Sequence, residues 1–263
     1  MRLSAIICFS GLGLAAPGAQ LHLDEQAKAA KIPTSYESAV MGRRILALSK
    51  LATFTTVFPS SQGFAAEENR PQGLDGVPIG LVDYVADCED TGNPTILAIT
   101  IGTSFKNVRD GSNLTLSLRW TPPYPPAKRI SLLSRIARLW SKRGPLPDPV
   151  PYSAANLARF SLFGHLEPLN ATSSSAADVT VCYTGKHPDA KYWLPGNKIH
   201  NSEWMRFVVT HVYWIGGFGN RAYIGWIPVD EWKSVTRKEW EAIELPGEKE
   251  GWNEWTLKHQ AEL

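Results

Sequence analysis

The sequence predicts a mainly β protein whose strands pair antiparallel and close into a barrel, with few helices. Six or seven stretches are rich in β-branched and aromatic residues, and turn-forming residues separate several of them. Few stretches carry apolar residues at helical spacing. Because several strands follow one another directly, an antiparallel barrel is the expected architecture.

The elements are expected in the following order. Residues 36–51 predict an amphipathic helix, since Val40, Ile45 and Leu48 recur at helical spacing. Part of 176–193 is also expected to be helical. The glycine-rich segment 216–220 tolerates positive φ and predicts a turn between the last two strands. Strands are expected at 52–58, 76–85, 96–101, 114–120, 158–169, 204–214 and 222–227.

Length and composition indicate one globular domain. The chain has 263 residues, of which 43% are hydrophobic and 20% charged, so it can bury one sizeable core. The net charge of +2 is too balanced to indicate a nucleic-acid binder. Most of the ten tryptophans lie in the C-terminal third, which is therefore expected to supply much of the core.

The N-terminus predicts entry into the secretory pathway. Residues 1–19 combine a basic start, a short apolar run and small residues suited to cleavage, as in a signal peptide. The alternative is a buried N-terminal helix. Asn113 and Asn170 begin N-x-S/T sequons and are candidate glycosylation sites. The expected location is outside the cell or in an endolysosomal or vacuolar compartment.

Cysteine usage leaves one pair in the mature chain. Cys8 would be removed with the signal peptide, so Cys88 and Cys182 remain. An oxidising compartment permits a disulfide between them, and two separate thiols are the alternative. No clustered cysteine and histidine pattern predicts a metal site.

A polar junction at 100–106 is the first candidate binding site. The apolar strand ends at Thr100, and a short helix is expected to begin near Thr103 and Ser104, with Lys106 just beyond. Helix N-termini offer free N–H groups and partial positive charge, so hydroxyls and a lysine there suit a phosphate monoester. The alternative is that Thr103 and Ser104 only cap the helix.

A proline-flanked insertion at 121–152 interrupts the strands. Within it, 128–143 has apolar residues on one helical face and basic residues on the other. Such a helix can lie on an anionic membrane surface, or it can pack as a lid on the barrel. The lid is favoured over peripheral membrane contact. The expected domains are thus 1–19, 36–234 with this insertion, and a C-terminal tail at 235–263.

Two segments resemble a known superfamily. The stretch LAITIGTSFKNVRDGSNLTLSL resembles the phosphate-binding segment of pyridoxamine 5'-phosphate oxidase-like flavoproteins. The segments HPDAKYWLPGN and IGGFGNRAY resemble the secreted CREG-like branch of that superfamily, in its fungal form. The resemblance implies an FMN-binding split β-barrel that forms a homodimer, with the flavin site at the subunit interface. It assigns the FMN phosphate contacts to Thr100, Ser104 and Lys106.

One departure weakens the flavin assignment. Flavin oxidases of this superfamily carry a basic residue on the preceding strand, but 76–85 contains neither arginine nor lysine. Two hypotheses therefore stand side by side: an FMN-dependent oxidoreductase acting on a small organic molecule, and a non-catalytic CREG-like glycoprotein. A haem-binding split barrel is a third. No catalytic residue is assigned, and His211 is expected to be a hydrogen-bonded core histidine.

Overall fold

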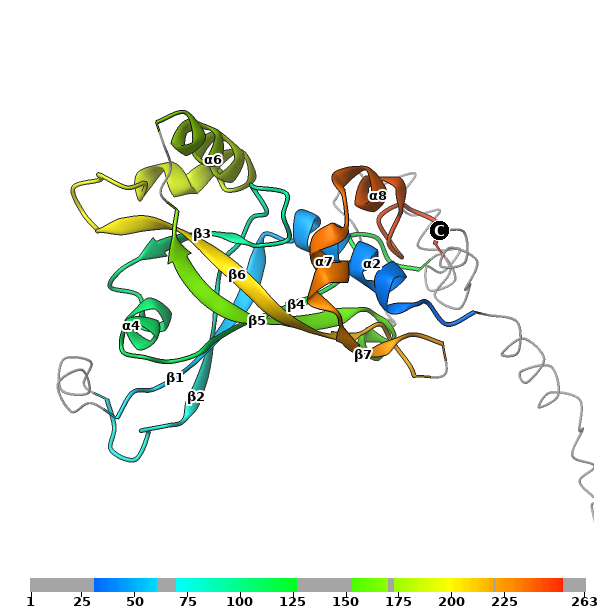
Figure 1. Ribbon diagram of the computed structural model, residues 1–263, viewed down its shortest axis with the longest axis horizontal. Helices are drawn as coiled ribbons and strands as arrows, with labels where there is room; N and C mark the ends of the chain where they lie inside the picture. Colours follow the sequence, from blue (N-terminus) through cyan, green and yellow to red (C-terminus); the bar gives the residue numbers. More distant parts are fainter. Residues whose placement is uncertain (1–30, 61–69, 127–152, 170–172, 220, 253–263) are drawn as a thin grey trace, which may run out of the picture.

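A seven-stranded antiparallel sheet forms the centre of the computed structural model, which describes residues 31–60, 70–126, 153–169, 173–219 and 221–252. Its elements in chain order are α2 (Ser35–Leu48), β1 (Leu51–Val57), β2 (Pro78–Tyr84), β3 (Thr95–Ile99), α4 (Thr103–Arg109), β4 (Leu114–Arg119), η2 (Ala154–Asn156), β5 (Arg159–Pro168), α6 (Ser173–Lys186), η3 (Pro188–Tyr192), β6 (Ser202–Ile215), β7 (Ile224–Ile227), α7 (Val229–Ser234) and α8 (Arg237–Ala242). Figure 1 shows α2, α7 and α8 lying together, with α6 set apart from them above β3.

The sheet closes on itself as a barrel. Its strand order is β2-β1-β4-β5-β6-β3, and β7 pairs with β6. An isolated antiparallel bridge between Ala86 and Thr95 joins the residues after β2 to the start of β3. The two outer strands of this order are thereby brought together, which removes much of the exposed sheet edge.

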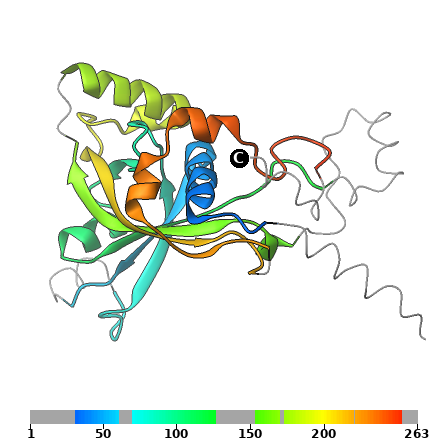
Figure 2. The same ribbon diagram turned by 45° about the vertical axis from the view of Figure 1, so that its right-hand side comes forward.

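The two longest strands, β5 and β6, curve across the sheet (Figure 2). Their register shifts between Phe163 and Gly164. A β-carbon at Gly164 would lie 2.0 Å from the carbonyl oxygen of Val208, so only glycine allows the strands this close approach. An irregularity of this kind bends a strand pair, which here helps to close the barrel.

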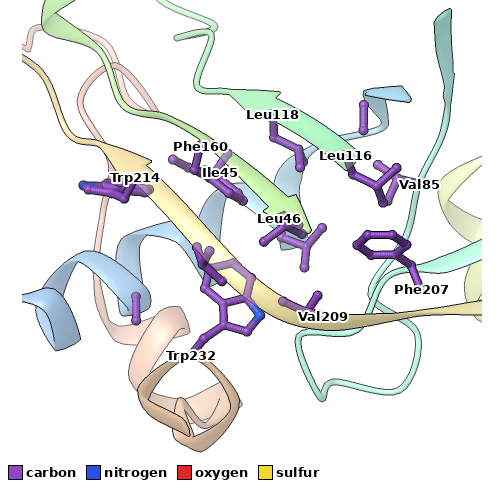
Figure 3. Close-up of a cluster of buried hydrophobic side chains, with 14 of the residues drawn as sticks. Ile45, Leu46, Val85, Leu116, Leu118, Phe160, Phe207, Val209, Trp214 and Trp232 are labelled. Atoms are coloured by element: carbon purple, nitrogen blue, oxygen red, sulfur yellow. The ribbon is translucent and has the colours of Figure 1, made fainter. Parts of the chain in front are cut away.

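Helix α2 packs against the inner face of the sheet. A capping box starts the helix, because the Thr34 hydroxyl accepts from the N–H of Glu37 and the Glu37 carboxylate accepts from the N–H of Thr34. Ile45 and Leu46 are fully buried. Figure 3 shows them among side chains from three strands, namely Leu116, Leu118, Phe160, Val209 and Trp214.

The chain after β7 continues the core. Trp232 on α7 is fully buried, and Trp240 on α8 and Leu245 beyond it also belong to the core. A second capping box, formed by Thr236 and Glu239, starts α8. The ordered fold therefore extends past residue 234, where the sequence places the start of a C-terminal tail.

A buried arginine ties α2 to two other segments. Arg43 donates hydrogen bonds to the carboxylate of Asp87, 3.2 Å away, and to the carbonyl oxygens of Trp232, Val235 and Asp90. The Asp87 side chain is 3% exposed. Burial raises the pKa of this carboxyl group, and the positive charge of Arg43 opposes the rise. Arg43 therefore joins α2 to the loop that follows β2 by an ion pair, and to α7 by a hydrogen bond.

Most expected elements are present. Each of the seven strand regions contains a strand, and the antiparallel mainly β prediction is confirmed. The first helix spans Ser35–Leu48 rather than 36–51, because Leu51 already pairs with Tyr84 in the sheet. Helices α7 and α8 are additions that the strand-based interpretation missed.

Candidate functional site

The phosphate residues expected from the sequence lie where β3 passes into α4. Gly102 is the N-cap of α4 and makes no side-chain cap hydrogen bond. Thr103 and Ser104 are the first two residues inside the helix, so the alternative that they cap it is wrong. The N–H groups of the first turn receive no side-chain acceptor from the cap, which leaves donors that an anion could use.

The three side chains do not converge as phosphate donors. The Thr100 hydroxyl donates to the carbonyl oxygen of Asn201 at 3.1 Å, and this uses its one proton. Ser104 is only 5% exposed. Lys106 lies two positions further along α4, and residues at that spacing do not share a helix face. Because a phosphate ester mainly accepts hydrogen bonds, Lys106 is the one charged donor among the three side chains.

Packing against β1 fixes this rotation of α4. The Asn107 amide donates to the Thr56 hydroxyl at 3.0 Å in a buried position. The Phe105 ring meets the Phe54 ring edge-on, with centroids 6.1 Å apart. Both contacts hold the side of α4 that carries Ser104 toward the core. Since β2 carries no basic residue, this set of side chains fits an FMN phosphate poorly.

The outer face of the sheet carries a second set of polar side chains. Directly paired residues on neighbouring strands point to the same face. The register places one outward row at Val82, Thr53, Ser117, Ser161, Tyr213 and Trp226. The next row contains Arg119, Arg159, Ile215 and Ile224. The alternate positions, such as Phe160 and Leu162, point inward to the core.

A groove of about 730 Å³ lies along these two rows. We call it the outer-face groove. Arg119 and Arg159 face each other across β4 and β5, and the hydroxyls of Ser117 and Ser161 are 2.9 Å apart. The volume lies within the range of small-molecule sites. Other lining residues include Leu51, Thr53, Val82, Tyr213 and Ile215.

An aromatic cluster continues the outer face beyond this groove. Trp226 on β7 is 56% exposed. Its ring lies 5.1 Å from that of Tyr213, 5.5 Å from Phe163 and 6.2 Å from His211. His211 is exposed, so its expected place in the core is wrong. It occupies an outward position of β6, opposite Phe163, and strand alternation decides its exposure.

Helix α6 is fastened to the barrel by a disulfide and a lysine. Cys88 and Cys182 form a disulfide, with their Cα atoms 5.8 Å apart. Of the two alternatives left by the sequence, a disulfide or two separate thiols, the structure has the disulfide. The Lys186 ammonium donates to the carbonyl oxygens of Leu46 and Ala47 at the end of α2. Burial lowers the pKa of Lys186 to about 8.

His187 sits between two tyrosine rings at the end of α6. Its ring centroid is 4.6 Å from that of Tyr84 and 4.8 Å from that of Tyr183. Its Nε2 donates to the carbonyl oxygen of Val85 at 3.0 Å. The residue is 2% exposed. Burial lowers the pKa of His187, and the nearby Lys186 charge acts in the same direction.

This lowered pKa predicts a loss of stability in mild acid. The unfolded chain binds a proton at His187 below about pH 6.5, before the folded chain does, so the free energy of unfolding falls as pH decreases from there. We expect His187→Gln, which keeps an N–H donor but does not titrate, to flatten this fall. Urea unfolding at pH 7.5 and pH 5 measures it. The exposed His211→Gln should leave the fall unchanged, and an equal fall in wild type and His187→Gln would contradict the assignment.

Several expected features fall elsewhere. Asn113 is exposed immediately before β4, as a glycosylation acceptor must be. Asn170, the signal segment 1–19 and the insertion helix 128–143 lie outside the described residues. Among the described helices, none has the length and apolar character needed to cross a bilayer. Nor does the described part of the chain place three or more metal-ligating side chains together.

The described strands form a closed antiparallel barrel with flanking helices. A sequence model described as CREG, beta-barrel, matches residues 33–234. The chain therefore belongs to the CREG β-barrel family. No curated protein matches it significantly.

Several solved structures are similar to this chain at low sequence identity. One of them is 15% identical to this chain, with a TM-score of 0.50. The alignment covers 78% of this chain and all of the solved structure. A haem-binding protein from Mycobacterium smegmatis is 16% identical with a TM-score of 0.48, and 78% of this chain covers 62% of it. A putative pyridoxamine 5'-phosphate oxidase from Listeria innocua is 9% identical with a TM-score of 0.37. The alignment covers 69% of this chain and 98% of the Listeria protein.

Proposed function

We propose that this chain is a non-catalytic binding protein of the secretory pathway. It forms a homodimer, and the outer face of its sheet is the surface through which it binds. The observation that carries this proposal is the poor fit of 100–106 to a flavin phosphate. The Thr100 proton is used by Asn201, and Ser104 is held toward the core. A flavin-dependent oxidoreductase needs a firm hold on its cofactor, and the side chains offer little beyond Lys106.

The disulfide supports the secretory location. A bond between Cys88 and Cys182 persists in oxidising compartments and is rare in the cytosol. The apolar N-terminal run of 1–19 and the exposed sequon asparagine, Asn113, agree with this location. Together they favour a secreted or endolysosomal glycoprotein over a cytosolic enzyme.

The outer face supports self-association. Exposed apolar side chains gather at its β7 end, where Trp226 and Ile224 are both exposed. Their partners on β6 are Tyr213 and Ile215. Val82, at the other end of the same row, is 65% exposed. Apolar surface of this kind on a folded domain commonly marks a protein interface. A second copy of the chain, seated on this face, would cover both ends.

An FMN-dependent oxidoreductase is the second candidate, and one observation favours it. The first turn of α4 has no side-chain cap, and Lys106 stands near it. Backbone N–H groups and one lysine could hold a phosphate without the two hydroxyls. Bound flavin would supply the redox chemistry. No residue of this chain is assigned to that chemistry.

The absorption spectrum and mass of the purified glycosylated protein test the proposal. We expect a colourless protein with twice the mass of one chain by light scattering, and no FMN binding that depends on Lys106. Stoichiometric FMN that is lost in Lys106→Gln would overturn the proposal in favour of the flavoenzyme. A Soret band would redirect it to haem. A monomer at micromolar concentration would contradict the homodimer.

A further inference from the structure

Two arginines face each other in the outer-face groove. Arg119 on β4 and Arg159 on β5 are direct partners in the antiparallel register. Like charges in directly opposite positions destabilise a sheet. A fold does not gain stability from this arrangement, so its presence beside a groove of about 730 Å³ points to a ligand.

Neither arginine is neutralised by the described part of the chain. No carboxylate there lies within ion-pair distance of Arg119 or Arg159. Arg159 donates to the carbonyl oxygen of Ala155 at 3.5 Å, a long contact that leaves most of its protons free. Other arginines of the fold do have carboxylate partners, as Arg43 and Arg206 have in Asp87 and Glu89. Within the described residues, the groove therefore holds two positive charges without a counter-charge.

The rest of the groove is suited to an organic body attached to the anion. Ser117 and Ser161 extend from the arginines as a pair of hydroxyls, 2.9 Å apart. Tyr213 supplies an aromatic wall, and Val82 and Leu51 supply apolar surface on the opposite side. Hydroxyls can bind a polar linker, whereas an aromatic wall packs against an apolar or planar group.

We infer that the outer-face groove binds a small organic oxyanion, with its charged head between the guanidinium groups of Arg119 and Arg159 and its apolar body against Tyr213. Guanidinium groups bind phosphate and carboxylate oxygens in a bidentate manner, and two of them can neutralise a dianion such as a phosphate monoester. This site is distinct from 100–106. The inference shares one premise with the proposed function, namely that the protein binds through the outer face of its sheet.

Calorimetric titration with phenyl phosphate tests the inference, with inorganic phosphate and phenol as reference ligands. We expect phenyl phosphate to bind at least tenfold more tightly than either reference. Inorganic phosphate lacks the ring that would pack against Tyr213, and phenol lacks the charged head that would bind the arginines. Added salt should weaken the binding, as it screens the arginine charges. Equal affinity for phenyl phosphate and inorganic phosphate would overturn the role of the apolar wall. No binding of phenyl phosphate would overturn the site.

Substitutions locate the binding. Arg119→Gln and Arg159→Gln should each weaken phenyl phosphate binding about tenfold, and the double variant should abolish it. Without ligand, the double variant should melt no lower than the wild type, because a like-charge pair is removed. Lys238→Gln, which removes one exposed positive charge on α8 away from the groove, is the control and should bind normally. Loss of binding in Lys106→Gln with retention in the double arginine variant would overturn the inference, whatever the outcome of the flavin test.

Discussion

Replacement of Arg43 by methionine is expected to lower the free energy of unfolding by about 3–5 kcal/mol, one of the two largest effects of single-site changes in this fold. The substitution leaves the Asp87 carboxylate buried without its counter-charge. It also removes the donors for the carbonyl oxygens of Trp232, Val235 and Asp90. Urea unfolding followed by tryptophan fluorescence measures the loss.

Two further variants separate the causes of this loss. Arg43→Met combined with Asp87→Asn should recover part of the stability, because the uncompensated charge is removed. Arg237→Met is the control, since Arg237 also pairs with Asp90 but at an exposed position, and it should cost at most about 1 kcal/mol. A similar loss for Arg43→Met and Arg237→Met would contradict the buried role of Arg43.

Loss of the disulfide is the second large effect. Replacing Cys88 and Cys182 by serine releases a loop with a sequence separation of 94 residues. Chain-entropy arguments give a stabilisation of about 4.7 kcal/mol for a loop of this length, because the bond restricts the unfolded chain. We expect the double variant to unfold at a lower urea concentration than the oxidised wild type. Comparison with reduced wild type gives the control.

The two effects are expected to be coupled. Asp87 and Cys88 are adjacent in the loop that follows β2, so both anchors hold the same segment to α2 and α6. Sites that share a segment rarely act additively. The variant that lacks both anchors should therefore differ from the sum of the separate losses. An unchanged midpoint on loss of the disulfide would contradict its role in the stability of the fold.

The strands were predictable from the sequence because their residue preference is local. Runs such as 96–101 and 204–214 combine β-branched and aromatic residues, and their pairing only adjusts their ends. Helix α8 was missed, although Thr236 and Glu239 have the spacing of a capping box that marks a helix start. The tryptophan-rich C-terminal segment already predicted that this region contributes to the core, and Trp240 does so.

The candidate site was less predictable because it depends on long-range geometry. The residue types at 100–106 suggest an anion site, but the rotation of α4 that turns Ser104 inward follows from contacts of Phe105 and Asn107 with β1. The outer-face groove depends on the register that places Arg119 opposite Arg159. That register is set by the packing of the whole sheet and cannot be read from either segment alone.

The position of a bound organic anion tests most directly whether the protein binds through the outer face of its sheet. A crystal structure of the protein grown with phenyl phosphate is the measurement. The predicted result is a phosphate group between the guanidinium groups of Arg119 and Arg159, with the phenyl ring against Tyr213. A phosphate group bound at the start of α4 beside Lys106, with none in the outer-face groove, would contradict the account.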